Sequence, residues 1–374
     1  MSPMLRRLFF STLIGAAMLW LAARQIDFSS LLSALGRAHW WVLLPYFAAM
    51  ALQHALRVWR WGHLLAPIHP VSFRRLLPIS SVGFFAIFAL PLRMGEFVRP
   101  YLVADPPRLR FTQALGTLAV ERVFDGLVVA LLAFAAVASA RLSGVPVPAW
   151  LAASGLLALG LFCAASVVLV IVLWQRERAV ALCRRVIAVF SPRLAERAAG
   201  IAAGIVDGFR ALPDTRRLLP FLAATAGYWA LNGAALWVLA RGFALELTAW
   251  QSMALVSLIG VGIMIPAGPG FIGNFELFAN GGLALYLPAA LLKQRGAAFI
   301  VASHVANAAW YLGAGAVAML SAHVGLRRLV GDSARAEAAA HAPSPPVGDE
   351  LDANAATNDA AASGHGGPAE SQGA

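Results

Sequence analysis

The sequence predicts an all-α fold, a polytopic transmembrane helical bundle. Its 374 residues are 60% hydrophobic and only 13% charged, with a mean hydropathy of +0.73. A soluble domain carries roughly 25% charged residues, so this composition cannot provide a water-soluble surface. Apolar runs close to the roughly 20 residues that cross a bilayer recur along the chain. The bilayer is therefore the solvent in which this chain is expected to fold.

The spans follow from these runs and from the arginines between them. Arginine-rich loops are expected on the cytoplasmic side of a membrane. This rule places both termini in the cytoplasm, together with Arg57, Arg60, Arg74 and Arg75 after the second span. In chain order, the predicted spans are residues 8–23, 40–59, 118–140, 149–174, 218–240 and 297–321.

The first of these runs has two interpretations. Arg6 and Arg7 precede it, as basic residues do in a cleavable signal peptide. The alternative, which we adopt, is an uncleaved first span.

Two apolar segments are interrupted by proline and glycine. Residues 76–92 contain Pro78 and Pro91, and arginines flank the segment on both sides, which argues against a simple crossing. A re-entrant segment, buried by neighbouring helices, explains this pattern. Residues 249–266 and 271–292 form a second interrupted pair.

The two interruptions share a spacing and have corresponding positions. Pro91 precedes Gly95 by four residues, as Pro269 precedes Gly273. Each half of the chain then consists of two spans, a broken segment and a further span, which is the pattern of an inverted repeat. Paired interruptions of this kind mark the central site of a transporter. Ordinary kinked helices are the alternative interpretation.

A transmembrane domain is predicted over residues 1–330 and includes a basic cytoplasmic segment at 175–217. This segment has three interpretations: part of it lies on the membrane surface, part of it packs under the bundle, or it is a solvated helix. Its apolar residues recur at helical spacing, at Leu194, Ala198, Ile201, Ile205 and Phe209. Residues 331–374 are rich in Ala, Ser, Gly, Pro and acidic residues and are predicted to form a disordered tail.

Several classes of site are not expected. The net charge of +11 comes from loops and helix ends rather than from a compact basic domain, so no nucleic acid is predicted as a partner. Cys163 and Cys183 provide neither a disulfide framework nor a metal site. No metal, cofactor or enzymatic activity is predicted. An intramembrane transferase would need an acidic metal-binding cluster, and Glu121 with Asp125 does not meet this requirement.

Ionisable residues stand at the first interruption and in the span that follows. They are Arg93, Glu96, Arg99, Glu121, Arg122 and Asp125. Such groups are costly in a membrane unless they pair or meet water. One interpretation is a structural ion-pair cluster, in which Arg122 pairs with Asp125 and Glu121 reaches Arg93 or Arg99. The other is a polar cavity, completed by Glu276, in which an unpaired arginine favours an anionic phosphate headgroup.

The second interruption and two polar stripes supply further candidates. Backbone amides at the break around Pro269, Gly270, Gly273 and Asn274 would add donors for a headgroup. The stripes have three- or four-residue spacing and are predicted to form hydrogen bonds between helices. They consist of Tyr228 with Asn232, and of His304 with Asn307 and Tyr311.

Three motifs resemble the lysylphosphatidylglycerol synthase transmembrane, or flippase-like, family. They are Arg-Met-Gly-Glu-Phe-Val-Arg-Pro at residues 93–100, Glu121-Arg122 with Asp125, and Pro-Gly-Phe-Ile-Gly-Asn-Phe-Glu at residues 269–276. The resemblance spans roughly residues 5–325. Phe275 departs from it, because many relatives have a basic residue there, which leaves the headgroup preference open. The residues that match the family's polar motifs are Arg93, Gly95, Glu96, Arg99, Glu121, Arg122, Pro269, Gly270, Gly273 and Glu276.

The resemblance implies a multi-span bundle in the cytoplasmic (inner) membrane. Fused members of the family translocate aminoacylated phospholipid, and other members accompany hopanoid, dolichol-linked sugar or envelope-glycan pathways. The aminoacyl transferase domain of the fused synthases is not expected, because only a short tail follows Asp332. We therefore predict a translocase of a phospholipid or lipid-linked envelope precursor, with phosphate-bearing membrane lipids as partners. The alternative is a non-catalytic scaffold that recruits envelope-biosynthesis enzymes through the basic segment.

Overall fold

The computed structural model describes residues 28–321 except 211, 213, 266 and 267, and every named element in this part of the chain is a helix. The longer helices are α3 (Leu43–Leu65), α4 (Phe73–Ala89), α6 (Phe111–Leu142), α7 (Ala149–Trp174), α10 (Thr215–Gly242), α11 (Ala249–Met264) and α14 (Ala297–Ser321). The shorter elements are α2 (Phe28–Gly36), η1 (Trp40–Val42), η2 (Pro91–Phe97), α5 (Val98–Val103), α8 (Arg176–Ala188), α9 (Pro192–Asp207), η3 (Pro269–Phe271), α12 (Asn274–Leu283), α13 (Ala289–Leu291) and the π-helical turn η4 (Leu292–Gly296). The all-α prediction is confirmed.

Most predicted spans correspond to long helices. The predictions for 149–174 and 297–321 coincide with α7 and α14, and α6 and α10 extend a few residues beyond the predicted limits. Four helices of the described chain are long and apolar enough to cross a membrane: α6, α7, α10 and the continuous stretch Ala289–Ser321. The span predicted at 8–23 and the tail at 331–374 lie outside the described residues.

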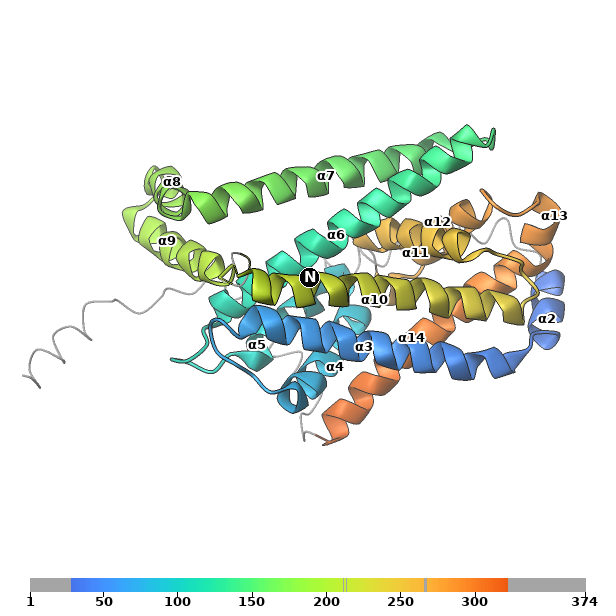
Figure 1. Ribbon diagram of the computed structural model, residues 1–374, viewed down its shortest axis with the longest axis horizontal. Helices are drawn as coiled ribbons and strands as arrows, with labels where there is room; N and C mark the ends of the chain where they lie inside the picture. Colours follow the sequence, from blue (N-terminus) through green and yellow to red (C-terminus); the bar gives the residue numbers. More distant parts are fainter. Residues whose placement is uncertain (1–27, 211, 213, 266–267, 322–374) are drawn as a thin grey trace, which may run out of the picture.

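Both interrupted segments enter the bundle and return to the end from which they came. In Figure 1, α3 ends and α6 begins at the end of the bundle where α8 and α9 lie, which we call the α8–α9 end. The intervening α4, η2 and α5 therefore turn back inside. At the opposite end, beside α2 and α13, α10 ends and α14 begins, with α11, η3 and α12 between them. The re-entrant interpretation thus describes both segments.

The two halves pack reciprocally. Helix α3 packs along α10 and runs in the opposite direction (Figure 1). The re-entrant α4 packs on α14, and its counterpart α11 packs on α6. The two breaks, η2 and η3, also contact one another. The broken helix of each half thus packs on the last span of the other half. Such reciprocal packing between two antiparallel halves is what an inverted repeat produces.

One apolar core joins the main helices. Its fully buried side chains include Met50 on α3, Val129 on α6, Leu239 on α10, Leu258 on α11 and Phe299 on α14. In a bilayer such packing is stabilised by van der Waals contact, because lipid tails are as apolar as the side chains. Helix α7 contributes Leu151 and Ala152 near its start to this core, but it exposes most of its apolar surface, as expected of a lipid-facing helix.

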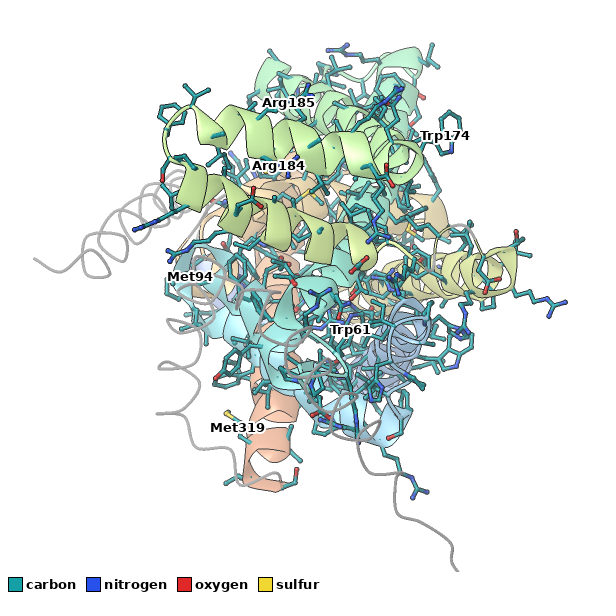
Figure 2. All side chains as sticks on the ribbon, turned by 90° about the vertical axis from the view of Figure 1, so that its left-hand side faces the viewer. Trp61, Met94, Trp174, Arg184, Arg185 and Met319 are labelled. Carbon is teal, nitrogen blue, oxygen red and sulfur yellow. The ribbon has the colours of Figure 1, made fainter. Side chains whose placement is uncertain are left out.

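The basic segment forms two helices across one end of the bundle. Figure 2, which views this end, shows α8 and α9 side by side. Helix α9 approaches α6 so closely that a Cβ on Gly116 would lie 2.1 Å from the Ile205 carbonyl oxygen. Of the predicted apolar face, Phe209 is buried but Leu194 is exposed. Part of the segment therefore packs under the bundle, which was one of the three interpretations.

A buried carboxylate fixes this pair of helices. Asp207, at the end of α9, accepts hydrogen bonds from Arg110 at 3.0 Å, from Arg210 at 3.3 Å and from Arg176. The three arginine side chains are about half exposed, whereas Asp207 is not. The carboxylate thereby ties the start of α8 and the loop before α6 to the end of α9.

Asp207→Asn is expected to loosen α8 and α9 by about 1 kcal/mol, since solvent screens the exposed partners. Amide hydrogen exchange in α8 and α9 should accelerate about fivefold. Glu196→Gln is the matched control, because Glu196 pairs with Arg184 at 3.8 Å and both side chains are exposed. Equal exchange in the two variants would show that Asp207 does not anchor this end.

Candidate functional site

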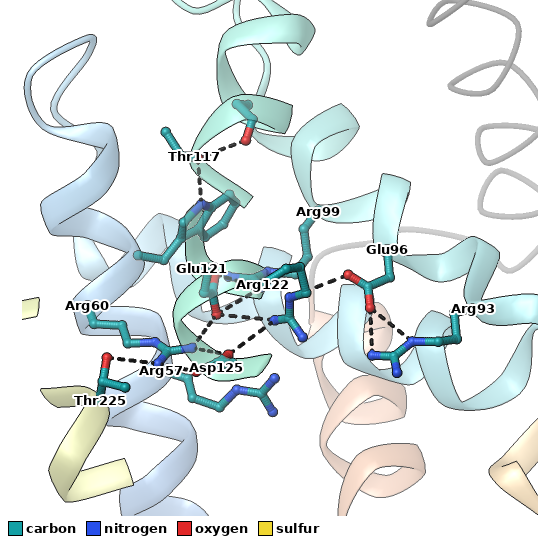
Figure 3. Close-up of polar contacts among 12 residues, drawn as sticks. Arg57, Arg60, Arg93, Glu96, Arg99, Thr117, Glu121, Arg122, Asp125 and Thr225 are labelled. Atoms are coloured by element: carbon teal, nitrogen blue, oxygen red, sulfur yellow. Dashed lines mark hydrogen bonds and ion pairs between the residues drawn. The ribbon is translucent and has the colours of Figure 1, made fainter. Parts of the chain in front are cut away.

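Arg60 is the centre of a buried ion-pair network between α3 and α6. Its side chain is fully buried and bonds both carboxylate oxygens of Asp125, at 2.7 and 2.6 Å. The same guanidinium group donates to Glu121 at 2.8 Å and to Thr225 of α10 at 3.0 Å (Figure 3). The prediction that Arg57 and Arg60 follow the second span, together with the cytoplasmic arginines, is therefore wrong. The helix continues to Leu65, and both arginines lie inside the bundle.

Arg99 approaches Glu121 from α5. Its guanidinium group lies 3.2 Å from a Glu121 oxygen, and both side chains are fully buried. The group also lies 4.2 Å from the centre of the Trp61 ring, whose Nε1 donates to Thr117 at 3.1 Å. The predicted contact of Glu121 with Arg99 is present. The alternative contact with Arg93 is not.

Arg122 and Glu96 extend the network to the first break. Arg122 lies 3.4 Å from Glu121, 3.8 Å from Asp125, as predicted, and 3.5 Å from Glu96. Glu96 in turn accepts two hydrogen bonds from Arg93, at 2.7 and 3.1 Å. Arg93 also donates to the carbonyl oxygen of Ile263 on α11, at 3.0 Å. The network thus reaches from α3 and α10 to the second re-entrant segment.

Arg57 has no carboxylate partner among the described residues. Its side chain is buried on α3, one helical turn before Arg60, and Figure 3 shows its guanidinium group apart from the carboxylates. Its contacts are a hydrogen bond of 3.2 Å to the Tyr311 hydroxyl and the faces of Phe84, at 3.8 Å, and Tyr228, at 5.0 Å. Aromatic faces stabilise a cation only in part.

The network is therefore positively charged. Arg57, Arg60, Arg93, Arg99 and Arg122 face three carboxylates, Glu96, Glu121 and Asp125, which leaves an excess of two positive charges. Buried charges are tolerated when they are paired and hydrogen-bonded, and an unbalanced cation attracts an anion. This site is suited to a negatively charged group.

A cavity of about 160 Å³ opens beside the unpaired arginine. A cavity needs roughly 10–15 Å³ to hold one water molecule, so this cavity is about ten times larger than that minimum. Aromatic rings of Phe84, Phe88, Phe271 and Phe275 form part of its wall. Its polar lining includes Tyr46, Arg57, Arg93, Arg122, Asp125, Tyr228, Asn232, Ser303, His304, Asn307 and Tyr311. A polar side facing an apolar side suits an amphipathic ligand.

The second break is held by its own polar contacts. The side-chain amide of Asn274 donates to the carbonyl oxygens of Gly262 and Ile265, both at 3.1 Å. The Gly273 amide donates to Glu276 at 2.7 Å, so it is not a free donor for a headgroup. Glu276 also bonds His304 on α14. Positive φ angles at Gly270 and Gly273, 72° and 90°, explain why glycine occupies these turns.

The predicted candidates divide between the cavity and its supports. Those that line the cavity are Arg93, Arg122, Asp125, Tyr228, Asn232, His304, Asn307 and Tyr311. Those that support it without being part of its lining are Gly95, Glu96, Arg99, Glu121, Pro269, Gly270, Gly273, Asn274 and Glu276. Glu276 thus contacts a cavity residue rather than completing the wall.

Arg57 and Arg60 were missed as candidates. The sequence did hold a signal for them, since their spacing of three residues places both on one helix face, inside an apolar run.

The family model described as lysylphosphatidylglycerol synthase TM region matches residues 8–315. No curated protein and no solved structure matches the chain.

Proposed function

The chain belongs to the family of the lysylphosphatidylglycerol synthase TM region, and we propose that it translocates a phosphate-bearing lipid, or a lipid-linked envelope precursor, across the cytoplasmic membrane. Its role would be transport rather than synthesis. The α8–α9 end, with its many arginines, would face the cytoplasm.

The observation that carries this proposal is the unpaired Arg57 at an amphipathic cavity. A guanidinium group binds phosphate through charge-assisted hydrogen bonds, which are stronger than neutral ones. Arg93 and Arg122 line the same cavity, and Asp125 is the carboxylate there. The headgroup would occupy the cationic side, while the aromatic wall would accommodate the first part of the acyl chains.

The position of the cavity supports movement of the ligand. It lies where the two breaks meet, since Arg93 of η2 and Phe271 of η3 both line it and lie 5.8 Å apart, measured from the guanidinium carbon to the ring centre. In transporters with inverted repeats, sites between broken helices become accessible from alternate sides as the repeats rock. Reciprocal packing of α4 on α14 and of α11 on α6 provides two such surfaces.

Arg57→Gln is expected to slow translocation of an anionic lipid about ten- to a hundredfold, the loss of a charge-assisted contact worth roughly 1.5–3 kcal/mol. Purified protein would be reconstituted in vesicles containing fluorescent phosphatidylglycerol, and its exchange between leaflets followed by quenching of the outer leaflet with dithionite. Fluorescent phosphatidylcholine should move more slowly, because the positive charge of its choline group neutralises the charge of its phosphate.

Arg241→Gln is the matched control, because Arg241 is exposed at the far end of α10 and lies over Trp237 rather than at the cavity. It should transport like the wild type. A wild-type protein that moves neither lipid faster than empty vesicles contradicts the proposal and favours the scaffold alternative. Equal rates for Arg57→Gln and Arg241→Gln would exclude Arg57 as the headgroup contact.

A further inference from the structure

His304 has a hydrogen-bond acceptor at each of its ring nitrogens. Nε2 lies 2.7 Å from the carbonyl oxygen of Gly270 in η3. Nδ1 contacts Oε1 of Glu276 on α12. The second oxygen of Glu276 accepts the Gly273 amide. One imidazole therefore connects α14 with both sides of the second break.

These contacts determine how many protons the pair holds. A neutral imidazole has one N–H donor and one acceptor nitrogen, and only imidazolium donates from both nitrogens. A carbonyl oxygen cannot donate, so Nε2 must carry a proton. The contact of Nδ1 with Glu276 requires a second proton, on the ring or on the carboxyl group. The pair holds one proton more than a neutral histidine beside an ionised glutamate.

The aromatic rings that contact His304 suit a cation on its imidazole ring. Phe275 stacks on His304 with the ring centres 4.3 Å apart, and Phe88 meets it edge-on at 6.1 Å. Aromatic rings attract a nearby cation, particularly where water is excluded. His304 is buried yet lines the cavity, so water in the cavity has a route to the proton.

We propose that His304 and Glu276 form a proton-binding site that couples proton movement to translocation through the neighbouring cavity. The coupling rests on the proposed function, whereas the proton site does not. When the proton leaves to water in the cavity, a neutral imidazole beside an ionised Glu276 can keep only one of its two bonds. The break is then released either at Gly270 or at Glu276.

Release at the break changes the cavity directly. Gly270 is followed by Phe271, a wall residue that lies beneath Arg93 of the first break. The proton therefore fixes η3 against α14, and its loss allows the two breaks to move relative to one another. A ligand shifts an equilibrium between two conformations only if it binds them with different free energies. The proton does so here, because both bonds of His304 form only when the pair is protonated.

The other charged and titratable groups at the cavity lie on several elements. They are Tyr46 and Arg57 on α3, Arg93 on η2, Arg122 and Asp125 on α6, Tyr228 on α10 and Tyr311 on α14. The arginines oppose a cation on His304, and Asp125 is bonded to Arg60. Among the described residues Glu276 is the carboxylate in contact with His304.

The proton site is tested by nitrogen-15 NMR of histidine-labelled protein in lipid nanodiscs. At neutral pH the wild type should show two ring N–H signals from His304, assigned by their loss in His304→Gln. Glu276→Gln should reduce them to one, because its amide can donate to Nδ1. His54→Gln is the control, since His54 is another buried histidine, bonded to Ser81 at 3.0 Å. A single N–H on wild-type His304 fits the proposal only if carbon-13 NMR of glutamate-labelled protein shows that the Glu276 carboxyl group is protonated. A single N–H beside an ionised Glu276 between about pH 5 and 8 overturns the proposal.

The coupling is tested with the same vesicles under a pH difference across the membrane. One coupled proton should shift the distribution of fluorescent phosphatidylglycerol about tenfold per pH unit in the wild type and in His54→Gln. Glu276→Gln should shift it less than about twofold. A wild-type distribution that ignores the gradient, or a full response in Glu276→Gln, overturns the coupling. A wild type that moves no lipid contradicts the proposed function, and the NMR spectra then decide the proton site alone.

Discussion

Arg60→Ala is expected to destabilise the folded protein by about 3–5 kcal/mol, the cost of removing one partner of a buried ion pair, because Asp125 loses both short hydrogen bonds and keeps only Arg122 at 3.8 Å. Asp125 and Glu121 are 7% and 0% exposed, so water cannot replace the guanidinium group that bonds them. Unfolding in detergent, followed by thermal or SDS titration, measures the loss. Combining Arg60→Met with Asp125→Leu should lose less than the sum of the single changes, because the pair is removed together.

An exposed pair provides the control for this prediction. Arg75 lies 3.5 Å from Asp105, and their side chains are 49% and 38% exposed. Arg75→Ala should therefore change the stability by less than about 1 kcal/mol. If Arg60→Ala costs no more than Arg75→Ala, the Arg60 network does not stabilise the bundle.

Gly95→Val is expected to prevent the first break from packing, with a loss of at least about 3 kcal/mol and a small yield of folded protein. A Cβ at Gly95 would lie 2.1 Å from the Ala86 carbonyl carbon and from the Ile87 amide nitrogen. Both are backbone atoms of α4, so no side-chain rotation can relieve the overlap. The variant would displace η2, and with it Arg93 and Glu96. Size-exclusion chromatography and thermal denaturation measure the outcome.

Gly160→Ala tests whether glycine replacement is harmful in general. This residue lies on α7, and an added Cβ there would meet nothing within 4 Å. Stability should stay constant or rise by up to about 1 kcal/mol, since alanine restricts the unfolded chain. A Gly95→Val protein as stable as Gly160→Ala would mean that η2 does not lie against α4 as described.

The sequence predicted the helices well where hydropathy alone sets them. Helix α7 matches its prediction to the residue because Pro148 and Arg176 bound its apolar run, whereas the helical stretch of the last predicted span begins earlier, at Ala289. Proline and glycine likewise indicated both breaks. The number of times a broken segment crosses the bilayer was harder to predict, because the length of an apolar run does not show where its helix turns.

The site was predicted only in part, because ion pairs depend on contacts between distant residues. Arg93, Arg122 and Asp125 were identified from their position beside a break. Arg57 and Arg60 were placed after the second span, on its cytoplasmic side, because arginines are expected to gather there. Arg60 is instead fully buried, and its partner Asp125 lies 65 residues further along the chain. A local sequence pattern cannot predict a partner that is so distant along the chain.

The buried arginines of α3 also have a consequence for biogenesis. Each arginine at the centre of a span adds roughly 2.5–3.5 kcal/mol to the cost of insertion, and α3 is not among the four helices of the described chain that are apolar enough to cross alone. Its countercharges, Glu121 and Asp125, leave the ribosome only with α6. Helix α3 is therefore expected to become stable in the lipid only after α6 has been synthesised, when Arg60 can pair with these carboxylates.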